Sequence, residues 1–256
     1  MSKTKYKLIL SYDGSDFCGW QRQKAHKHAS PLPSIQETME QALSKILNHH
    51  VDVSASGRTD AGVHALNQVC HFETERTLPK DLCWALKSQL PSTISAKSVQ
   101  PISNDFHATL SAVRKTYRYW IWNHPRAPAL LNRFTWWIRH PLDLEKLNKL
   151  SQPLLGEKDF ASFRTMGTEL KTTVRRIERA EWVLRRPGLL EFRITGNGFM
   201  KQMVRNIVGT IVTLEKAGET PEKMSEIIGL CDRQKAGTTA PAQGLFLYNV
   251  EYPKES

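Results

Sequence analysis

Short β-rich runs alternate with amphipathic helical segments along this chain, and this alternation restricts the folds that it can adopt. A β-rich run over Tyr6–Tyr12 ends at Asp13-Gly14, which is a turn signal. Ser34 and Glu37 form a capping box, after which apolar residues recur every fourth position and predict a helix. Strands are expected near residues 51–54, 68–72, 97–102 and 114–123, and a helix from residue 79 through residue 86.

The second half of the chain repeats this style. Arg186-Pro187-Gly188 joins two strand-like runs, 177–185 and 189–195, into a predicted antiparallel hairpin. A long helix is predicted from about residue 197 to 216, with an apolar ridge of Phe199, Met203, Ile207, Ile211 and Leu214. A shorter helix is expected near residues 142–150, and a last strand over 245–251.

These elements predict an α+β fold with two similar halves around a central basic cleft. Each half is expected to be a mostly antiparallel sheet with helices on one face. The 256 residues are enough for two cores, and we place the boundary after residue 103. The predicted domains are therefore an N-terminal one over 1–103 and a C-terminal one over 104–256.

The charge balance favours an anionic partner. Lys and Arg number 36 against 25 Asp and Glu, a net charge of +11. Such an excess is typical of nucleic-acid binding, with an anionic membrane surface as the alternative. The stretch from Arg164 to Arg205 contains ten cations and four anions. Aromatic residues also alternate with cations over 114–120, a pattern that suits stacked or flipped bases.

The cysteines and the hydropathy pattern exclude several other classes. Cys18, Cys70, Cys83 and Cys231 are far apart and form no CxxC pair, so neither a disulfide framework nor a zinc site is expected. No apolar window is long enough for a membrane span, and the first residues do not resemble a signal peptide. We therefore expect a cytoplasmic protein without a bound metal.

The nine-residue segment Gly57-Arg58-Thr59-Asp60-Ala61-Gly62-Val63-His64-Ala65 is the sharpest signal in the chain. Taken by itself, Asp60 could merely cap a loop by accepting hydrogen bonds from nearby backbone N–H groups. The whole segment, however, resembles the catalytic motif of the TruA family of tRNA pseudouridine synthases. Five further blocks resemble this family in the same order: 12–23, 105–108 with 117–119, 159–164, 196–200 with 203–209, and 240–245. One departure is the basic segment Lys24–Pro33, which is longer than the family's usual link to the first helix.

The resemblance implies an activity and a partner. Members of the family convert uridine to pseudouridine in the anticodon stem-loop of tRNA, at positions 38, 39 and 40. The reaction neither changes an oxidation state nor removes a group, so no cofactor and no metal are expected. The absence of dinucleotide-binding, P-loop and zinc motifs agrees with this expectation. The resemblance also implies a homodimer in which one tRNA contacts both subunits.

The chemistry assigns roles to five residues. A carboxylate can add to C1′ and later leave, so Asp60 is the candidate nucleophile, either by attack at C1′ or by promoting elimination to a glycal. A buried carboxylate needs a paired cation, and Arg205 on the long helix is the candidate. In the family, the arginine at Arg58 holds the flipped-out nucleotide, Tyr117 stacks on the uracil, and Leu245 lines the opposite side. The simpler alternatives are that Arg205 is a surface arginine, that Tyr117 is a core residue, and that Leu245 only packs within the sheet.

Two other functions remain open from the sequence. A non-catalytic tRNA-binding or RNA-chaperone protein would have the same basic stretch, although the set Arg58, Asp60, Tyr117 and Arg205 argues against it. A basic metal-dependent nuclease would require clustered carboxylates, whereas Asp60 alone lies in a loop motif.

Overall fold

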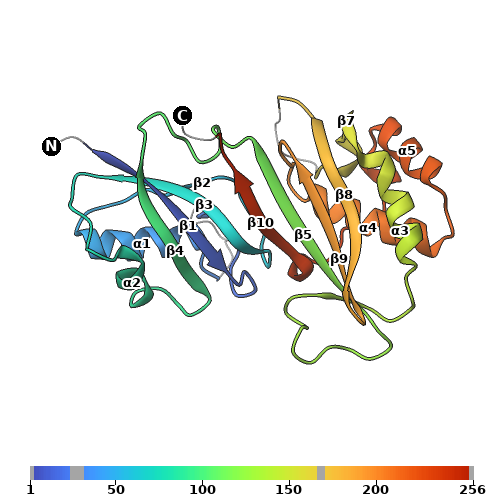
Figure 1. The fold of residues 1–256 in the computed structure, drawn as a ribbon, viewed down its shortest axis with the longest axis horizontal. Helices are drawn as coiled ribbons and strands as arrows, with labels where there is room; N and C mark the ends of the chain where they lie inside the picture. The colour runs from blue at the N-terminus through green and yellow to red at the C-terminus, as the bar shows by residue number, and fades with distance from the viewer. Residues whose placement is uncertain (1–2, 24–31, 166–170, 254–256) are drawn as a thin grey trace. The chain divides into compact units, whose positions relative to one another are not determined.

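The computed structural model describes residues 3–23, 32–165 and 171–253 (Figure 1). The predicted class is confirmed, because the described residues form a mixed α+β structure whose strands pair mostly antiparallel. Two compact units divide the chain: residues 1–113 with 247–256, and residues 114–246. The boundary expected after residue 103 thus lies within the first unit, ahead of the strand that opens the second.

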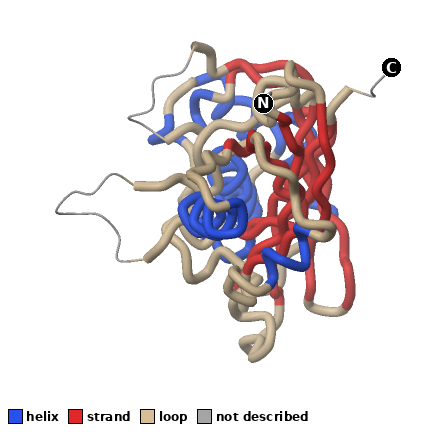
Figure 2. The backbone as a smooth tube through the Cα atoms, turned by 90° about the vertical axis from the view of Figure 1, so that its left-hand side faces the viewer, coloured by secondary structure: helices blue, strands red, loops and turns tan. Residues whose placement is uncertain are grey.

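The first unit is built around β1 (Thr4–Tyr12), which pairs antiparallel with β3 (His64–Thr74) and with β4 (Ile94–Ile102). The short β2 (Ser54–Ala55) extends along β3, and β10 (Leu245–Glu251) follows β3 in the strand order. Two helices that contact each other, α1 (Ile35–Leu47) and α2 (Leu82–Lys87), complete the unit. In the first unit, which faces the viewer in Figure 2, the longest helix lies to one side of the strands. The predicted cap of α1 is confirmed, since the Ser34 side chain accepts a hydrogen bond from the Glu37 N–H.

The second unit has strands in the order β5-β9-β8-β7, all antiparallel: Arg114–Asn123, Leu189–Gly196, Val174–Arg186 and Gly156–Asp159. A short β6 (Trp136–Ile138) runs parallel to β5. The helices α3 (Leu144–Ser151), α4 (Met203–Lys216) and α5 (Pro221–Leu230) contact one another. Short 3₁₀ turns lie at 152–154, 161–163, 233–235 and 242–244.

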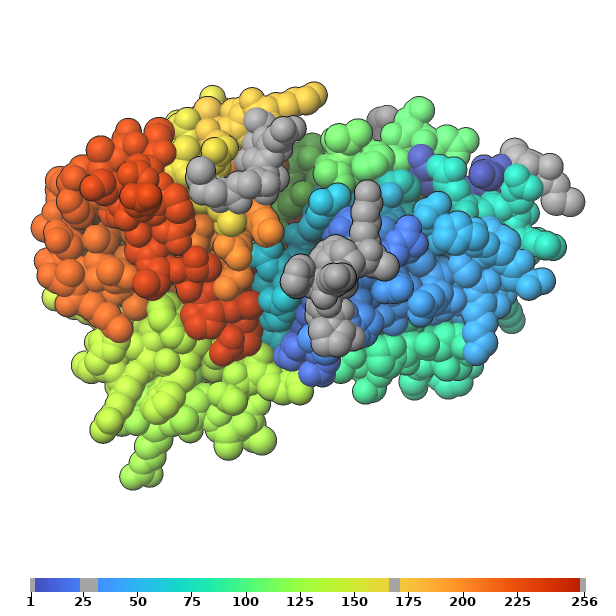
Figure 3. All heavy atoms as spheres, turned by 180° about the vertical axis from the view of Figure 1, so that it is seen from behind, coloured from blue at the N-terminus to red at the C-terminus, as the bar shows by residue number. Residues whose placement is uncertain are grey.

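Several elements differ from the sequence-based expectation. The long helix begins at Met203 rather than near residue 197, because Gln202 adopts a left-handed conformation (φ 59°) directly before it. Phe199 therefore precedes the helix and is not part of its apolar ridge. The strands β6 and β7 and the helix α5 were not expected. The loop between β5 and β6 projects from the second unit, with Leu130 almost fully exposed in it (Figures 1 and 3).

Candidate active site

In the first unit, Thr59 anchors the catalytic-motif loop to the neighbouring strand and to the opening motif. The Thr59 side chain is buried, and its hydroxyl lies 2.8 Å from the hydroxyl of Tyr12 at the end of β1. Its carbonyl oxygen accepts a hydrogen bond of 3.0 Å from the Trp20 N–H. Buried Gln68 on β3 holds the start of the loop, because its Nε2 donates to the Gly57 carbonyl at 2.8 Å. These contacts fix the backbone at Gly57 and Thr59, directly before Asp60.

Two glycines of the opening motif allow this loop to approach. A Cβ added to Gly14 would lie 2.0 Å from the Val63 carbonyl oxygen, and one added to Gly19 would lie 2.7 Å from the Thr59 carbonyl oxygen. Gly19 also has φ +105°, a conformation that favours glycine. The motif at 12–23 and the motif at 57–65 therefore pack together as two parts of one structure.

Arg58 and Asp60 flank the inward-pointing Thr59. Side chains alternate in extended chain, so the burial of Thr59 directs its two neighbours to the other side. Arg58 is exposed and Asp60 is half-buried. Asp60 forms an isolated antiparallel bridge with Gly19, and its carbonyl oxygen accepts from the Val63 N–H at 3.1 Å in a tight turn.

Tyr117, Arg205 and Leu245 belong to the second unit. Tyr117 is buried on β5, and its ring meets Phe199 edge to face with centroids 5.1 Å apart. Arg205 lies in the first turn of α4, where its Nε donates to the Ala240 carbonyl at 2.7 Å. The Ala240 N–H in turn donates to the Arg205 carbonyl at 3.1 Å. Arg205 therefore fixes the segment that leads to Leu245.

Leu245 is buried at the start of β10, and the turn before it is pinned by Tyr119. The Tyr119 hydroxyl donates to the Pro241 carbonyl at 2.7 Å, and a Cβ on Gly244 would lie 2.6 Å from the Tyr119 ring. Burial raises the pKa of the Tyr119 hydroxyl, while the charge of nearby Arg205 opposes this rise. Three blocks of the sequence, at 117–119, 203–209 and 240–245, thus meet in one place within the second unit.

Comparison with known proteins identifies the family. A family model described as tRNA pseudouridine synthase matches residues 8–110 and 150–253. The chain belongs to the tRNA pseudouridine synthase family.

Curated relatives agree over nearly the whole length. The chain is 54% identical to tRNA pseudouridine synthase A of Bdellovibrio bacteriovorus, covering 98% of this chain and 96% of that protein. It is 42% identical to tRNA pseudouridine synthase A of Hydrogenovibrio crunogenus, covering 96% and 91%. It is also 42% identical to the protein of that name from Blochmanniella pennsylvanica, covering 98% and 94%.

For a member of this family, the distribution of cations decides which surfaces can meet RNA. Several arginines of the basic stretch are already engaged with carboxylates. Buried Glu191 on β9 accepts from Arg193 Nε at 2.6 Å and from Trp120 Nε1 at 2.8 Å, with Arg118 NH1 at 3.6 Å. Burial opposes ionisation of Glu191, but these hydrogen bonds and charges outweigh it and hold its pKa below the usual range.

Ion pairs engage further cations on the same strands. Arg179 pairs with Glu181, which also lies 3.5 Å from Arg193, and Arg185 lies 3.8 Å from Glu191. Arg176 and Arg186 are likewise exposed on β8, but among the described residues their side chains form no ion pair. The sequence-based count of ten cations therefore overstates the positive charge available to RNA, because pairs within β8 and β9 and between neighbouring strands engage several of them.

In residues 3–23, 32–165 and 171–253, no group of three or more His, Cys, Asp or Glu side chains could hold a metal ion. Within the same residues, no helix is long and apolar enough to cross a membrane. His64, a buried residue within the catalytic motif, has a structural role: its Nδ1 accepts a hydrogen bond of 3.1 Å from the Gly14 N–H.

Sequence reasoning missed some residues that build the site. Phe199 was assigned to a helix ridge, yet it contacts Tyr117. Gln68 was treated only as a strand residue, and Tyr12 only as the last residue of a strand and the first residue of the opening block, although both hold the catalytic-motif loop. Their position inside or beside recognised motifs was the available signal, because polar groups buried on strands need hydrogen-bond partners. The segment Lys24–Pro33 lies mostly outside the described residues.

Proposed function

We propose that this chain isomerises uridine to pseudouridine at positions 38, 39 and 40 of tRNA, with Asp60 as the nucleophile. As a tRNA pseudouridine synthase, the chain is an isomerase that acts on tRNA. In this reaction the bond between uracil N1 and ribose C1′ breaks, and a bond between C5 and C1′ forms. The proton lost from C5 balances the proton gained by N1, so the reaction consumes no second substrate.

The anchored loop around Asp60 is the observation that carries this proposal. A nucleophile must reach C1′ with a defined geometry, because a misplaced reacting group loses much of the advantage of an enzyme. Gly57 and Thr59, which directly precede Asp60, are tied to buried side chains, while Asp60 itself remains half-buried. A mere loop cap would not require two glycines to admit the loop backbone so closely.

The other four residues complete the proposed site. Arg205 supplies the positive charge that keeps the Asp60 carboxylate ionised during the reaction. Tyr117 stacks on the uracil and takes the C5 proton, and Leu245 provides apolar contact on the other side. Arg58 fills the space that the flipped nucleotide leaves in the RNA stack. The exposure of Arg58 and the ordered surroundings of Tyr117 and Arg205 support these roles.

The net charge of +11 supports electrostatic binding of tRNA. We propose that a central basic cleft holds the anticodon stem-loop, that two copies of the chain act together on one tRNA, and that the protein works in the cytoplasm without a metal or cofactor.

One experiment tests the activity and its alternatives together. Unmodified tRNA is incubated with the protein in the presence of EDTA, and pseudouridine is mapped by position. Conversion at positions 38, 39 or 40 is the expected result. Strand breaks that disappear with EDTA would instead indicate a metal-dependent nuclease. Tight binding without conversion would indicate a non-catalytic tRNA-binding or RNA-chaperone protein.

A further inference from the structure

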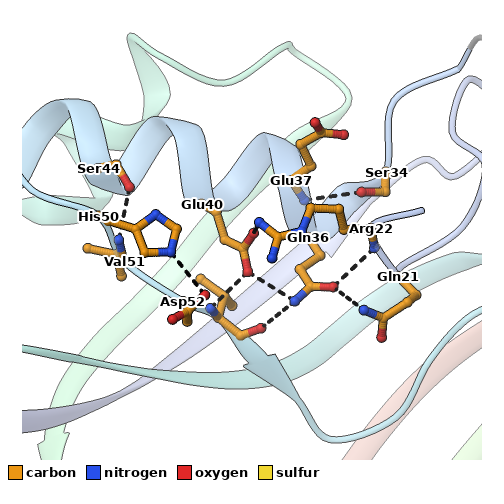
Figure 4. A network of polar contacts seen from close by, with 11 residues as sticks. Gln21, Arg22, Ser34, Gln36, Glu37, Glu40, Ser44, His50, Val51 and Asp52 are labelled. Carbon is orange, nitrogen blue, oxygen red and sulfur yellow. Dashed lines mark hydrogen bonds and ion pairs between the residues drawn. The ribbon is translucent and has the colours of Figure 1, made fainter. Parts of the chain in front are cut away.

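A buried carboxylate on α1 organises the end of the opening motif. Glu40 is only 4% exposed, and three groups donate to it. Gln36 Nε2 and the Val53 N–H reach its Oε1 at 2.9 and 3.2 Å, and Arg22 NH1 reaches its Oε2 at 3.0 Å. Figure 4 shows Glu40 and Gln36 extending from the helix toward Gln21 and Arg22. Glu40 thus links the helix, the opening motif and the segment before β2 that leads to the catalytic-motif loop.

Gln36 holds the backbone of the same segment. Its Oε1 accepts from the Arg22 N–H at 3.1 Å and from Gln21 Nε2 at 2.8 Å. Its Nε2 also donates to the Val53 carbonyl at 3.1 Å. Arg22 is therefore fixed twice, at its main chain by Gln36 and at its side-chain tip by Glu40.

Arg22 nevertheless remains open to solvent. Its side chain is 48% exposed, whereas the side chain of its partner is 4% exposed. A guanidinium has five N–H donors, and the contact with Glu40 is made by NH1 alone. Such an arginine is oriented before any ligand arrives, so binding an anion costs little side-chain entropy. Planar guanidinium groups also match phosphate oxygens in a forked geometry.

We propose that Arg22 is a phosphate-binding residue for tRNA, and that Glu40 and Gln36 are the positioning residues that hold it. The proposal rests on the function proposed above, since it assumes a tRNA substrate. The opposing explanation is that Arg22 only neutralises a buried carboxylate. The two explanations differ in what they predict for the salt dependence of binding.

The experiment measures the affinity for an unmodified tRNA transcript between 50 and 200 mM salt. Replacing Arg22 alone would leave the Glu40 charge buried without its partner and could prevent folding. The main variant is therefore the double substitution Arg22→Gln and Glu40→Gln, which removes both charges. Losing one phosphate contact should lower the slope of log K against log salt by about 0.7 to 0.9. The affinity should fall roughly 5- to 10-fold at 100 mM salt, and the loss should raise KM more than it lowers kcat.

Three further variants separate binding from folding and from general charge. Arg76→Gln, in the exposed turn after β3, removes one guanidinium elsewhere in the same unit and should leave the slope unchanged. Arg22→Lys keeps the charge but loses the fork, so the slope should persist with an affinity about 2- to 3-fold weaker. Glu40→Gln should weaken binding by a similar factor without changing the slope, because Arg22 keeps its charge but loses its anchor.

A double variant with the slope and affinity of the wild type would overturn the phosphate contact. An equal change of slope in Arg76→Gln would show that the effect is not specific to Arg22. Binding by Glu40→Gln that is as tight as the wild type or tighter would contradict the positioning role of Glu40. Pseudouridine formation by the wild type, measured on the same preparation, tests the proposed function separately. A wild type that binds tRNA without converting it would contradict that function and leave the salt slopes to decide about Arg22.

Discussion

Substituting Gly19 with alanine should displace the catalytic-motif loop without touching any residue proposed to act in the reaction. The added Cβ would lie 2.7 Å from the Thr59 carbonyl oxygen, whereas ordinary contacts of this kind begin near 3.4 Å. The obstacle is backbone, so it cannot rotate away. Relief requires a main-chain shift of about 0.7 Å beside Asp60, the difference between those two distances.

A shift of this size sets the expected loss. Misplacing a reacting group by about 1 Å can cost on the order of 100-fold in rate. Gly19→Ala should therefore lower the single-turnover rate at saturating tRNA about 10- to 100-fold, which corresponds to about 1.4 to 2.7 kcal/mol in the barrier. The backbone strain at φ +105° should also cost about 1 to 3 kcal/mol of stability.

Gly218→Ala is the matched control. Gly218 also has a positive φ, +71°, but a Cβ there meets nothing within 4 Å. This variant should show lower thermal stability with an unchanged rate, because it carries the strain without the displacement. The reasoning would be refuted if folded Gly19→Ala reacted at the wild-type rate, or if Gly218→Ala lost as much activity.

Further outcomes are expected for tRNA binding, for the reaction rate and for stability. The affinity for tRNA should fall roughly 10- to 10³-fold between 50 and 200 mM salt, as for about three to six phosphate contacts. Arg176→Gln should weaken this binding more than Arg179→Gln, since Arg179 is already paired with Glu181, and a filter-binding titration that ranks them oppositely would contradict the charge map. Arg205→Met should lower the single-turnover rate at least about 100-fold, and Arg205→Lys should retain part of the activity, because it keeps the charge. Equal rates for both variants would argue against an electrostatic role. Burial, together with the charges of His107 and Lys5, lowers the pKa of His71 to about 4. The unfolded chain, whose His71 keeps the ordinary pKa near 6.5, therefore takes up this proton first, and stability falls as the pH drops from 6.5 to 4. The free energy of unfolding, measured with urea, should decrease over that pH range by roughly 3 kcal/mol less in His71→Gln than in the wild type. Equal decreases in the two proteins would contradict the assignment.

Local patterns predicted many elements well. The strands β5 and β10 begin and end at the predicted residues, because β-branched and aromatic residues fill them and turn signals bound them. The helix α1 follows from its cap and from apolar residues at Ile35, Met39, Leu43 and Leu47, all of which are buried. Such features depend on neighbours in sequence.

Other features depend on distant parts of the chain. The return of residues 247–256 to the first unit arises from contacts such as the one between Asn67 Nδ2 and the Tyr248 carbonyl at 2.7 Å. The left-handed Gln202 that delays α4 has no local signal, because glycine and asparagine are the residues expected in that conformation. The helix α5 did have a signal, since Thr220 and Pro221 form a typical helix start before Met224, Ile227 and Ile228.

The candidate site likewise contains residues that the sequence identifies and residues that only the structure reveals. The motif itself selected Asp60 and Arg58, because the whole nine-residue string resembles the family. The residues that hold the motif, such as Tyr12 and Gln68, became evident from hydrogen bonds between strands that are far apart in sequence. Burial raises the pKa of Tyr12 to about 12, so its hydroxyl stays protonated and available to Thr59 at neutral pH.

The most direct test of the central claim is the conversion of tRNA by Asp60→Asn. The amide has nearly the same shape as the carboxylate but cannot act as a nucleophile that later leaves. Single-turnover pseudouridine formation should fall by about 10³-fold or more, equivalent to at least about 4 kcal/mol, while tRNA affinity stays within about 3-fold of the wild type. Asp52→Asn, the same change at an exposed position just before β2, should react normally. A rate for Asp60→Asn above about one tenth of the wild-type rate would contradict the assignment of Asp60 as the nucleophile.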